Sequence, residues 1–180
     1  FRLTPLSPRD TLPLLAAEGF QASRQVVVMT SDMWRVADVG GSPAVELASA
    51  AGVEWAETYL AAYDELDGRP RLELAEAAPS PRRFALARGD AGVAGIALGV
   101  IVDGALGLFD VLTVPEHRRQ GVATTTVDSL LAWGREAGAD LAYLQVASDN
   151  SDALRLYERL GFSAAYEYLY AWPAPPSSPL

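Results

Sequence analysis

The sequence predicts an α/β protein in which helices flank a central mixed β-sheet. The first observation is the order of apolar segments between residues 82 and 172, which is strand, strand, strand, helix, strand, helix, strand. A helix that joins two strands of one sheet indicates at least one parallel crossover. The second observation is composition: of 180 residues, 50% are apolar and 21% charged, as in globular proteins with a sizeable core.

The predicted strands are short runs rich in Val, Ile, Ala and aromatic residues. Residues 82–88 and 92–102 form the first two, and Asp103-Gly104 then predicts a hairpin turn. A third strand follows at 105–114, and Pro115 ends it. Two later runs complete the set: residues 141–147 alternate in polarity, and residues 166–172 are aromatic.

Helical spacing of apolar residues predicts a helix over 120–137, which Gly138 ends in the C′ position. A second helix over 153–160 begins after several N-cap candidates and stops at Gly161. Upstream, residues 45–66 predict an amphipathic helix with Trp55, Tyr59 and Tyr63 spaced four apart. We expect that aromatic stripe to be buried core rather than a ligand contact.

The first 31 residues repeat part of the later pattern. Both regions show a short helix, a Gly-Phe stop and then a strand, and at one offset Leu14, Gly19, Phe20 and Ala22 match Leu156, Gly161, Phe162 and Ala164. Chance is one explanation, because Gly-Phe after a helix is common. The other is that residues 1–31 are the remnant of a duplicated unit. The tail, residues 173–180, contains four prolines and is expected to be an unpacked end.

Composition excludes several classes of function. A net charge of −9 argues against nucleic-acid binding, and no apolar run approaches the roughly 20 residues that span a bilayer. One His and no Cys argue against a zinc site, so we expect no metal. There is no Lys, so an anion site must use Arg or backbone N–H groups. The cytoplasm is the default location, and the acidic surface favours a cationic substrate such as an amine.

The segment Val114-Pro115-Glu116-His117-Arg118-Arg119-Gln120-Gly121-Val122-Ala123 lies between a predicted strand and a predicted helix. A helix N-terminus offers unpaired N–H groups and a favourable dipole, so it binds phosphates readily. Gly121 allows close approach of the backbone, and the two arginines add charge-assisted donors. We expect His117 and Glu116 to be exposed residues of this turn.

This region resembles the GNAT acyltransferase superfamily. Arg118, Gly121 and Ala123 fit its coenzyme A signature, and Asn150, Ala153, Tyr157 and the Leu160-Gly161-Phe162 stop fit its last helix. The resemblance implies a GNAT domain over residues 45–172 with a GNAT-like fold. If Asn150 and Tyr157 are needed for activity, the leading copy is catalytically dead, since it has Pro8 and Leu15 in their places.

The family also implies a role for each residue of the site. Leu112 and Val114 would present backbone groups to the pantetheine arm, and Asn150 and Ala153 belong to the helix that helps position the cosubstrate. Tyr157 would be the general acid that protonates the departing thiolate; a buried core aromatic is the alternative. The diphosphate would be held by the following segment: Arg118, Arg119, Gln120, Gly121, Val122, Ala123 and Thr124.

The general base is less clear. Related ribosomal-protein alanine N-acetyltransferases carry a Glu on the penultimate strand, where this sequence has Gln145, which cannot accept a proton. That departure counts against the same substrate class. Asp110 is the best remaining carboxylate; a solvent-facing Asp at a strand end and a water chain as base are the alternatives.

The leading hypothesis is therefore transfer of an acetyl group from acetyl-CoA to the amine of a small molecule or peptide, by direct attack. The alternative is an acetyl-CoA-binding module without catalysis. A Rossmann-type dinucleotide binder is disfavoured, because G-x-G-x-x-G is absent. The acceptor and the oligomeric state stay open, with a homodimer among the options.

Overall fold

The computed structural model describes residues 1–33, 45–63, 65–90 and 92–174. Over these residues the strands form one nine-stranded mixed sheet, in which eight follow the order β1-β9-β3-β8-β7-β6-β5-β4 and β2 pairs with β9. Along the chain the elements are β1 (Arg2–Leu3), α1 (Thr11–Ala17), β2 (Phe20–Ala22), β3 (Val26–Asp32), β4 (Val45–Ala48), α2 (Val53–Ala61), α3 (Glu65–Glu76), β5 (Arg82–Gly89), β6 (Gly92–Val102), β7 (Ala105–Thr113), the 3₁₀ turn η1 (Pro115–His117), α4 (Val122–Glu136), β8 (Leu141–Ala147), α5 (Ser151–Arg159) and β9 (Ser163–Pro173).

The central strands confirm the prediction of a mixed sheet. β5, β6 and β7 form an antiparallel meander, and the turn between β6 and β7 has positive φ at Asp103 (49°) and Gly104 (75°). This is the turn geometry that Asp-Gly favours in two-residue hairpins. β7 then pairs with β8 in parallel, with α4 as the crossover helix.

β7 and β8 separate after a short stretch of pairing. Their parallel ladder runs only from Ala105 opposite Leu141 to Leu108 opposite Leu144. Beyond that point β7 stays paired with β6, and the end of β8 stays paired with β3. A bulge in β7 accompanies the separation, since the register shifts between Ile96 and Leu98 of β6. The carboxyl ends of the two strands therefore diverge at one edge of the sheet.

The region from residue 45 to 80 differs from the prediction. Val45–Ala48 is a strand paired with β5, so the expected helix over 45–66 begins only at Val53 and ends at Ala61. α3 was not predicted, because Gly68 and Pro70 interrupt its helical pattern. Gly68 has a packing reason: a Cβ there would lie 3.2 Å from Leu60 Cδ2, so the glycine lets α2 and α3 approach each other.

Helices cover the two faces of the sheet, and each layer contributes a core. One cluster joins α4 and α5 to the sheet through residues such as Val127, Leu130 and Leu160. The other joins α2 to β5 and β6 through Trp55, Tyr59 and Phe84. Trp55 stacks on Tyr59 at 5.1 Å, which confirms that these two rings of the stripe belong to the core.

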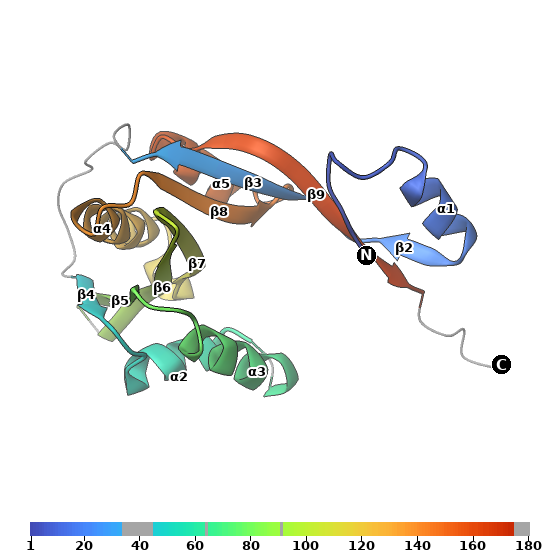
Figure 1. Cartoon of the computed structure of the whole chain (residues 1–180). Helices are drawn as coiled ribbons and strands as arrows, with labels where there is room; N and C mark the ends of the chain where they lie inside the picture. Colours follow the sequence, from blue (N-terminus) through green and yellow to red (C-terminus); the bar gives the residue numbers. More distant parts are fainter. Residues whose placement is uncertain (34–44, 64, 91, 175–180) are drawn as a thin grey trace.

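Strands from the start and from the end of the chain pair with each other. β3 lies between β8 and β9 and is antiparallel to both, while the last residues of β9 lie between β1 and β2. We call residues 1–25 together with 169–174 the arm; it projects from the rest of the molecule (Figure 1). The arm has little core, since α1 contains no buried residue and Leu6 and Leu14 are exposed. Residues 175–180 of the predicted tail lie outside the described residues, and Pro173 ends β9.

Candidate active site

The topology brings the two predicted motifs to the same edge of the sheet. β7 and β8 are parallel neighbours, so their carboxyl ends lie at the same edge of the sheet although the two strands separate there. β7 leads through η1 into α4, and β8 leads through Asn150 into α5. In open α/β sheets, ligands bind outside the carboxyl ends of neighbouring strands. The Arg118–Thr124 turn and Asn150 therefore flank the separation between β7 and β8.

The turn before α4 has the backbone geometry of an anion-binding loop. Arg119 has φ 60° and Gly121, the N-cap residue, has φ 84°, both in the left-handed region. No side chain caps the helix, and its first backbone hydrogen bond runs from Thr125 N to Gly121 O. The N–H groups of Val122, Ala123 and Thr124 thus lack intrahelical partners. The helix begins at Val122, two residues later than predicted.

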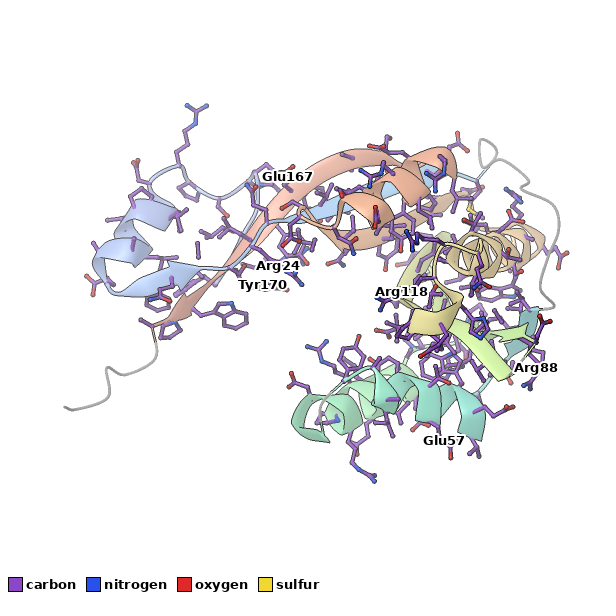
Figure 2. The ribbon with its side chains drawn as sticks, turned by 180° about the vertical axis from the view of Figure 1, so that it is seen from behind. Arg24, Glu57, Arg88, Arg118, Glu167 and Tyr170 are labelled. Atoms are coloured by element: carbon purple, nitrogen blue, oxygen red, sulfur yellow. The ribbon has the colours of Figure 1, made fainter. Side chains whose placement is uncertain are left out.

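The side chains of the turn leave this face available. Arg118 and Arg119 are exposed, and neither takes part in an ion pair among the described residues. Figure 2 shows the Arg118 side chain beside η1 and the start of α4. Gln120 points back, because its Nε2 donates to the carbonyl of Glu116 at 3.0 Å. Its contribution to an anion site would therefore come from its backbone.

The threonine run at the start of α4 divides into two kinds. Thr125 and Thr126 donate their hydroxyls to backbone carbonyls four residues earlier, at 3.2 and 2.7 Å. Thr124 is half-buried, and within the described residues its hydroxyl has no hydrogen-bond partner. Of the three hydroxyls, that of Thr124 is the one left to bind a ligand.

The strand residues are more constrained than expected. The N–H of Val114 donates to Ala94 O at 2.9 Å, and its carbonyl accepts from the N–H of His117 at 2.9 Å. Antiparallel ladders alternate, so Leu112, paired with Ile96, also directs its backbone groups toward β6. The same alternation turns the backbone groups of Thr113 toward the separation from β8. Sequence reasoning missed Thr113, because the pairing that decides its direction is not visible in the motif.

Asn150 has a structural role in this fold. It is the N-cap of α5, and its Oδ1 accepts a hydrogen bond from Ala153 N at 3.2 Å. An N-cap amide of this kind stabilises a helix by about 1 kcal/mol. Asn150 therefore fixes the start of the helix that carries Tyr157, and its side-chain N–H groups stay available to a ligand.

Tyr157 lies two turns into α5 and is only 8% exposed. Its ring contacts Phe162 edge-on, with ring centroids 6.0 Å apart. Burial raises the pKa of Tyr157 to about 12, so the phenol keeps its proton at neutral pH. Among the described residues its hydroxyl has no hydrogen-bond partner, which leaves the proton available to a ligand. The same burial makes the phenol a weaker acid than free tyrosine.

Asp110 lies in the β7 bulge and is not a freely solvated strand end. Its φ of 50° is uncommon for a residue with a side chain, and bulges often redirect side chains next to active sites. The hydroxyl of Tyr59 donates to Asp110 Oδ1 at 3.3 Å. Burial raises the pKa of Asp110, which strengthens it as a base, although the Tyr59 hydrogen bond and the charge of Arg71 oppose the rise.

Gln145 and His117 take other roles. The amide oxygen of Gln145 accepts a hydrogen bond from the hydroxyl of Tyr168, so this side chain of β8 is tied to β9. His117 is half-buried, and a Cβ on Gly89 would lie 2.7 Å from its Cε1. The expectation that His117 is exposed was wrong, because η1 packs this ring against β5.

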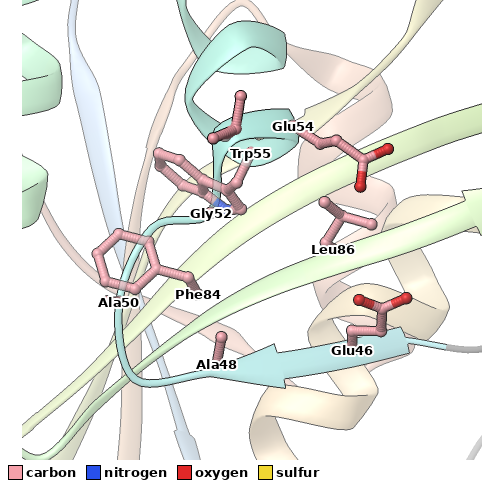
Figure 3. Close-up of a pocket in the computed structure, with 9 residues that line it drawn as sticks. Glu46, Ala48, Ala50, Gly52, Glu54, Trp55, Phe84 and Leu86 are labelled. Atoms are coloured by element: carbon pink, nitrogen blue, oxygen red, sulfur yellow. The ribbon is translucent and has the colours of Figure 1, made fainter.

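A hollow lies elsewhere, between β4, β5 and the start of α2 (Figure 3). Its lining is mostly apolar, with Glu46 and Glu54 at its rim. Arg88 pairs with both carboxylates, with Nε 2.6 Å from Glu46 Oε1 and Nη2 2.8 Å from Glu54 Oε2. Hydrogen bonds from Arg88 hold the pKa of Glu54 below its ordinary value. None of the predicted site residues lines this hollow, and its carboxylates are poor candidates for a base.

The described residues contain neither a metal-binding cluster nor a helix that could span a bilayer. No group of three or more His, Cys, Asp and Glu side chains lies together in them as a metal site would need. Of their helices, none is long and apolar enough to cross a bilayer.

Comparison with known sequences supplies a family. Residues 50–162 match the profile of the acetyltransferase (GNAT) family. A curated relative, the uncharacterized N-acetyltransferase YobR of Bacillus subtilis, is 37% identical over 76 residues, or 41% of this chain and 31% of the relative. The ribosomal protein bS18-alanine N-acetyltransferase of Escherichia coli is 33% identical over 66 residues, or 37% of this chain and 44% of the relative. The chain spans less than half the length of these two relatives.

Solved structures support the same fold. A GCN5-related N-acetyltransferase from Sphaerobacter thermophilus gives a TM-score of 0.71 at 18% identity, over 94% of this chain and 58% of that one. Another from Kribbella flavida gives 0.67 at 22% identity, over 94% and 66%. A tandem GNAT protein of the clavulanic acid biosynthesis pathway gives 0.65 at 16% identity, over 98% and 64%. At these identities the likeness establishes the architecture alone.

Proposed function

The chain belongs to the GNAT acetyltransferase family, and we propose that it transfers an acetyl group from acetyl-CoA to the primary amine of a small molecule or peptide. The observation that carries this proposal is the turn before α4. It offers uncapped N–H groups, left-handed residues at Arg119 and Gly121, and two exposed arginines beside the separation of β7 and β8. That combination suits a diphosphate.

The cosubstrate would be held from three sides. The N–H groups of Val122, Ala123 and Thr124 would face the diphosphate, with the Thr124 hydroxyl beside them. Thr113 would offer its backbone N–H and carbonyl groups to the pantetheine arm. The carbonyl oxygens of Leu112 and Val114 would add any lone pairs that their own hydrogen bonds leave free. On the β8 side, Asn150 and Ala153 would fix the start of α5 and so place Tyr157.

The proposed chemistry gives Asp110 and Tyr157 opposite tasks. Asp110, directly or through water, would take a proton from the ammonium form of the acceptor, so that its nitrogen can attack the thioester carbon. As the carbon–sulfur bond breaks, Tyr157 would donate its phenolic proton to the leaving thiolate and regain one from the new amide nitrogen. Its raised pKa makes complete transfer costly, so Tyr157 would act chiefly by donating a hydrogen bond to the developing charge.

Two measurements test this function together. A thermal-shift titration with acetyl-CoA measures uptake, and amine-dependent release of free coenzyme A across a panel of amines measures transfer. Stabilisation together with amine-dependent release is the expected result. A folded protein that acetyl-CoA fails to stabilise would exclude the assignment.

A second candidate is an acetyl-CoA-binding module that does not catalyse. It is favoured by Gln145, which stands where related enzymes have Glu and is tied to Tyr168. Stabilisation by acetyl-CoA with no release of coenzyme A for any amine would support this candidate.

We also propose that residues 1–31 are the remnant of a duplicated unit beside a GNAT domain over 45–172. Gly19 and Gly161, matched in the sequence repeat, both follow a short helix with left-handed φ values of 81° and 90°. The strands after them, β2–β3 and β9, pair with each other in one antiparallel ladder, as two related units would about a twofold axis. One structure of similar fold is described as a tandem GNAT protein, which agrees with this proposal.

A further inference from the structure

Asp110 and Arg71 are linked by a series of side-chain contacts and yet form no ion pair with each other. Tyr59 donates to Asp110, Tyr63 packs on Tyr59, and the Arg71 guanidinium lies over Tyr63; the positive charge of Arg71 also opposes the rise in the pKa of Asp110. The ion pairs found among the described residues include neither of them. Exposed charged side chains are usually free to move, and holding two of them in one geometry costs side-chain entropy. Two opposite charges that stay near each other without pairing must therefore each be held by other contacts.

Aromatic rings of α2 supply that cause. Tyr63 packs against Tyr59 with ring centroids 5.0 Å apart, and the Arg71 guanidinium carbon lies 5.2 Å from the centre of the Tyr63 ring. A guanidinium over an aromatic face keeps the N–H groups at its edge free for a planar anion. Arg71 is exposed on α3, so a ligand can reach those donors.

The Asp110 carboxylate is held as firmly as the Arg71 guanidinium. The β7 bulge turns Asp110 toward α2, and the Tyr59 hydroxyl donates to it. Tyr59 is itself only 2% exposed and stacks on Trp55, so this donor is rigid. Asp110 is half-buried and keeps part of its surface open. Two opposite charges are therefore held on separate elements, with aromatic surface between them.

We propose that this site binds an acceptor that carries a carboxylate beside its primary amine, as an amino acid does. The ammonium group would pair with Asp110 and the carboxylate with the free edge of Arg71. The proposal rests on the acetyl transfer proposed above, because Asp110 is also the group that would deprotonate the amine. It narrows the acceptor from amines in general to amines that carry an anion.

The test compares matched acceptors on the full chain. Each amino acid in the panel is paired with its amide and with its decarboxylated amine, and kcat/KM is expressed per neutral amine to correct for amine basicity. Wild type should prefer the amino acid roughly 10- to 100-fold, the range expected for charge-assisted hydrogen bonds. Arg71→Gln should abolish the preference through KM. Arg69→Gln, which removes another exposed arginine of α3 on a different face of that helix, should retain it.

The outcomes separate the two proposals. Equal rates for the matched acceptors, or a loss in Arg71→Gln that is the same for all three, would overturn the acceptor assignment while leaving acetyl transfer standing. If no amine is acetylated, binding decides: with coenzyme A present, an amino acid should raise the melting temperature of wild type but not of Arg71→Gln. Without that difference, the acceptor site is refuted as well.

Discussion

The substitution Tyr157→Phe tests whether the buried phenol acts in catalysis or only in packing. It removes one hydroxyl and leaves the ring, with its edge-on contact to Phe162, in place. The side chain is only 8% exposed, but its hydroxyl has no partner among the described residues and is not among their buried unsatisfied polar atoms, so the oxygen reaches solvent. Removing a solvated hydroxyl breaks no internal hydrogen bond and leaves no buried group unpaired. We therefore expect Tyr157→Phe to be about as stable as wild type.

Activity, in contrast, should fall. General acid catalysis contributes roughly 10²- to 10⁴-fold, and the raised pKa of Tyr157 places this case near the lower end. We expect kcat to fall about 100-fold with little change in the stabilisation by acetyl-CoA. Chemical denaturation gives the free energy of unfolding, and release of coenzyme A gives kcat. Tyr168→Phe is the stability control: its hydroxyl donates to Gln145, so its removal should cost about 1 kcal/mol.

Unchanged stability together with lower turnover separates a functional group from a packing group. If Tyr157→Phe turns over acetyl-CoA at the wild-type rate, the phenol has no catalytic role. If the variant loses several kcal/mol of stability, the hydroxyl has a structural partner, and our account of it as free for a ligand is wrong.

Three further predictions concern the pKa of Asp110, the turn before α4 and the exposed surface of the arm. Tyr59→Phe removes the hydrogen bond that lowers the pKa of Asp110, so that pKa should rise and the acid limb of the kcat/KM profile should move to higher pH; an unmoved limb would show that Asp110 is not the base. Gly121→Ala forces a Cβ into φ 84°, so we expect a loss of about 1 kcal/mol and weaker stabilisation by acetyl-CoA, with Gly52→Ala, at ordinary φ, as the control. If the exposed apolar residues of the arm join two copies as a homodimer, Leu14→Asp should halve the mass measured by light scattering, whereas Leu74→Asp on α3 should not; a monomeric wild type would refute the dimer.

Local signals in the sequence predicted the central elements well. β5 to β8 and α4 to α5 have clear periodicity, and the turn residues Gly104, Gly138 and Gly161 adopt the positive φ that their positions indicated. Errors arose where the decisive contact lies far along the chain. Val45–Ala48 is a strand because β5 lies beside it, and α3 tolerates Gly68 because Leu60 of α2 packs there. The hydrophobic periodicity of a short stretch of sequence reveals neither of these two distant contacts.

The site divides in the same way. The turn before α4 was predictable, because a helix N-terminus and its glycine are neighbours in sequence. The contact between Tyr59 and Asp110 was not, since it joins residues 51 positions apart and depends on a bulge in β7. The backbone direction of Thr113 likewise depends on the register with β6. Each of these features forms only when the strands have paired, so the local sequence does not reveal it.

The pairing of β3 with β9 makes a strand near the start of the chain and the last strand depend on each other. β8 and β9 are joined in the sheet only through β3, so a fragment that begins after residue 32 would expose two unsatisfied strand edges in the middle of the sheet. β9 in turn reaches its place beside β1 and β2 only after the whole domain has been synthesised. Such distant pairing slows folding and couples the ends into one cooperative unit. Any shortened version of this protein should therefore keep Val26–Asp32, however dispensable the sequence before it proves to be.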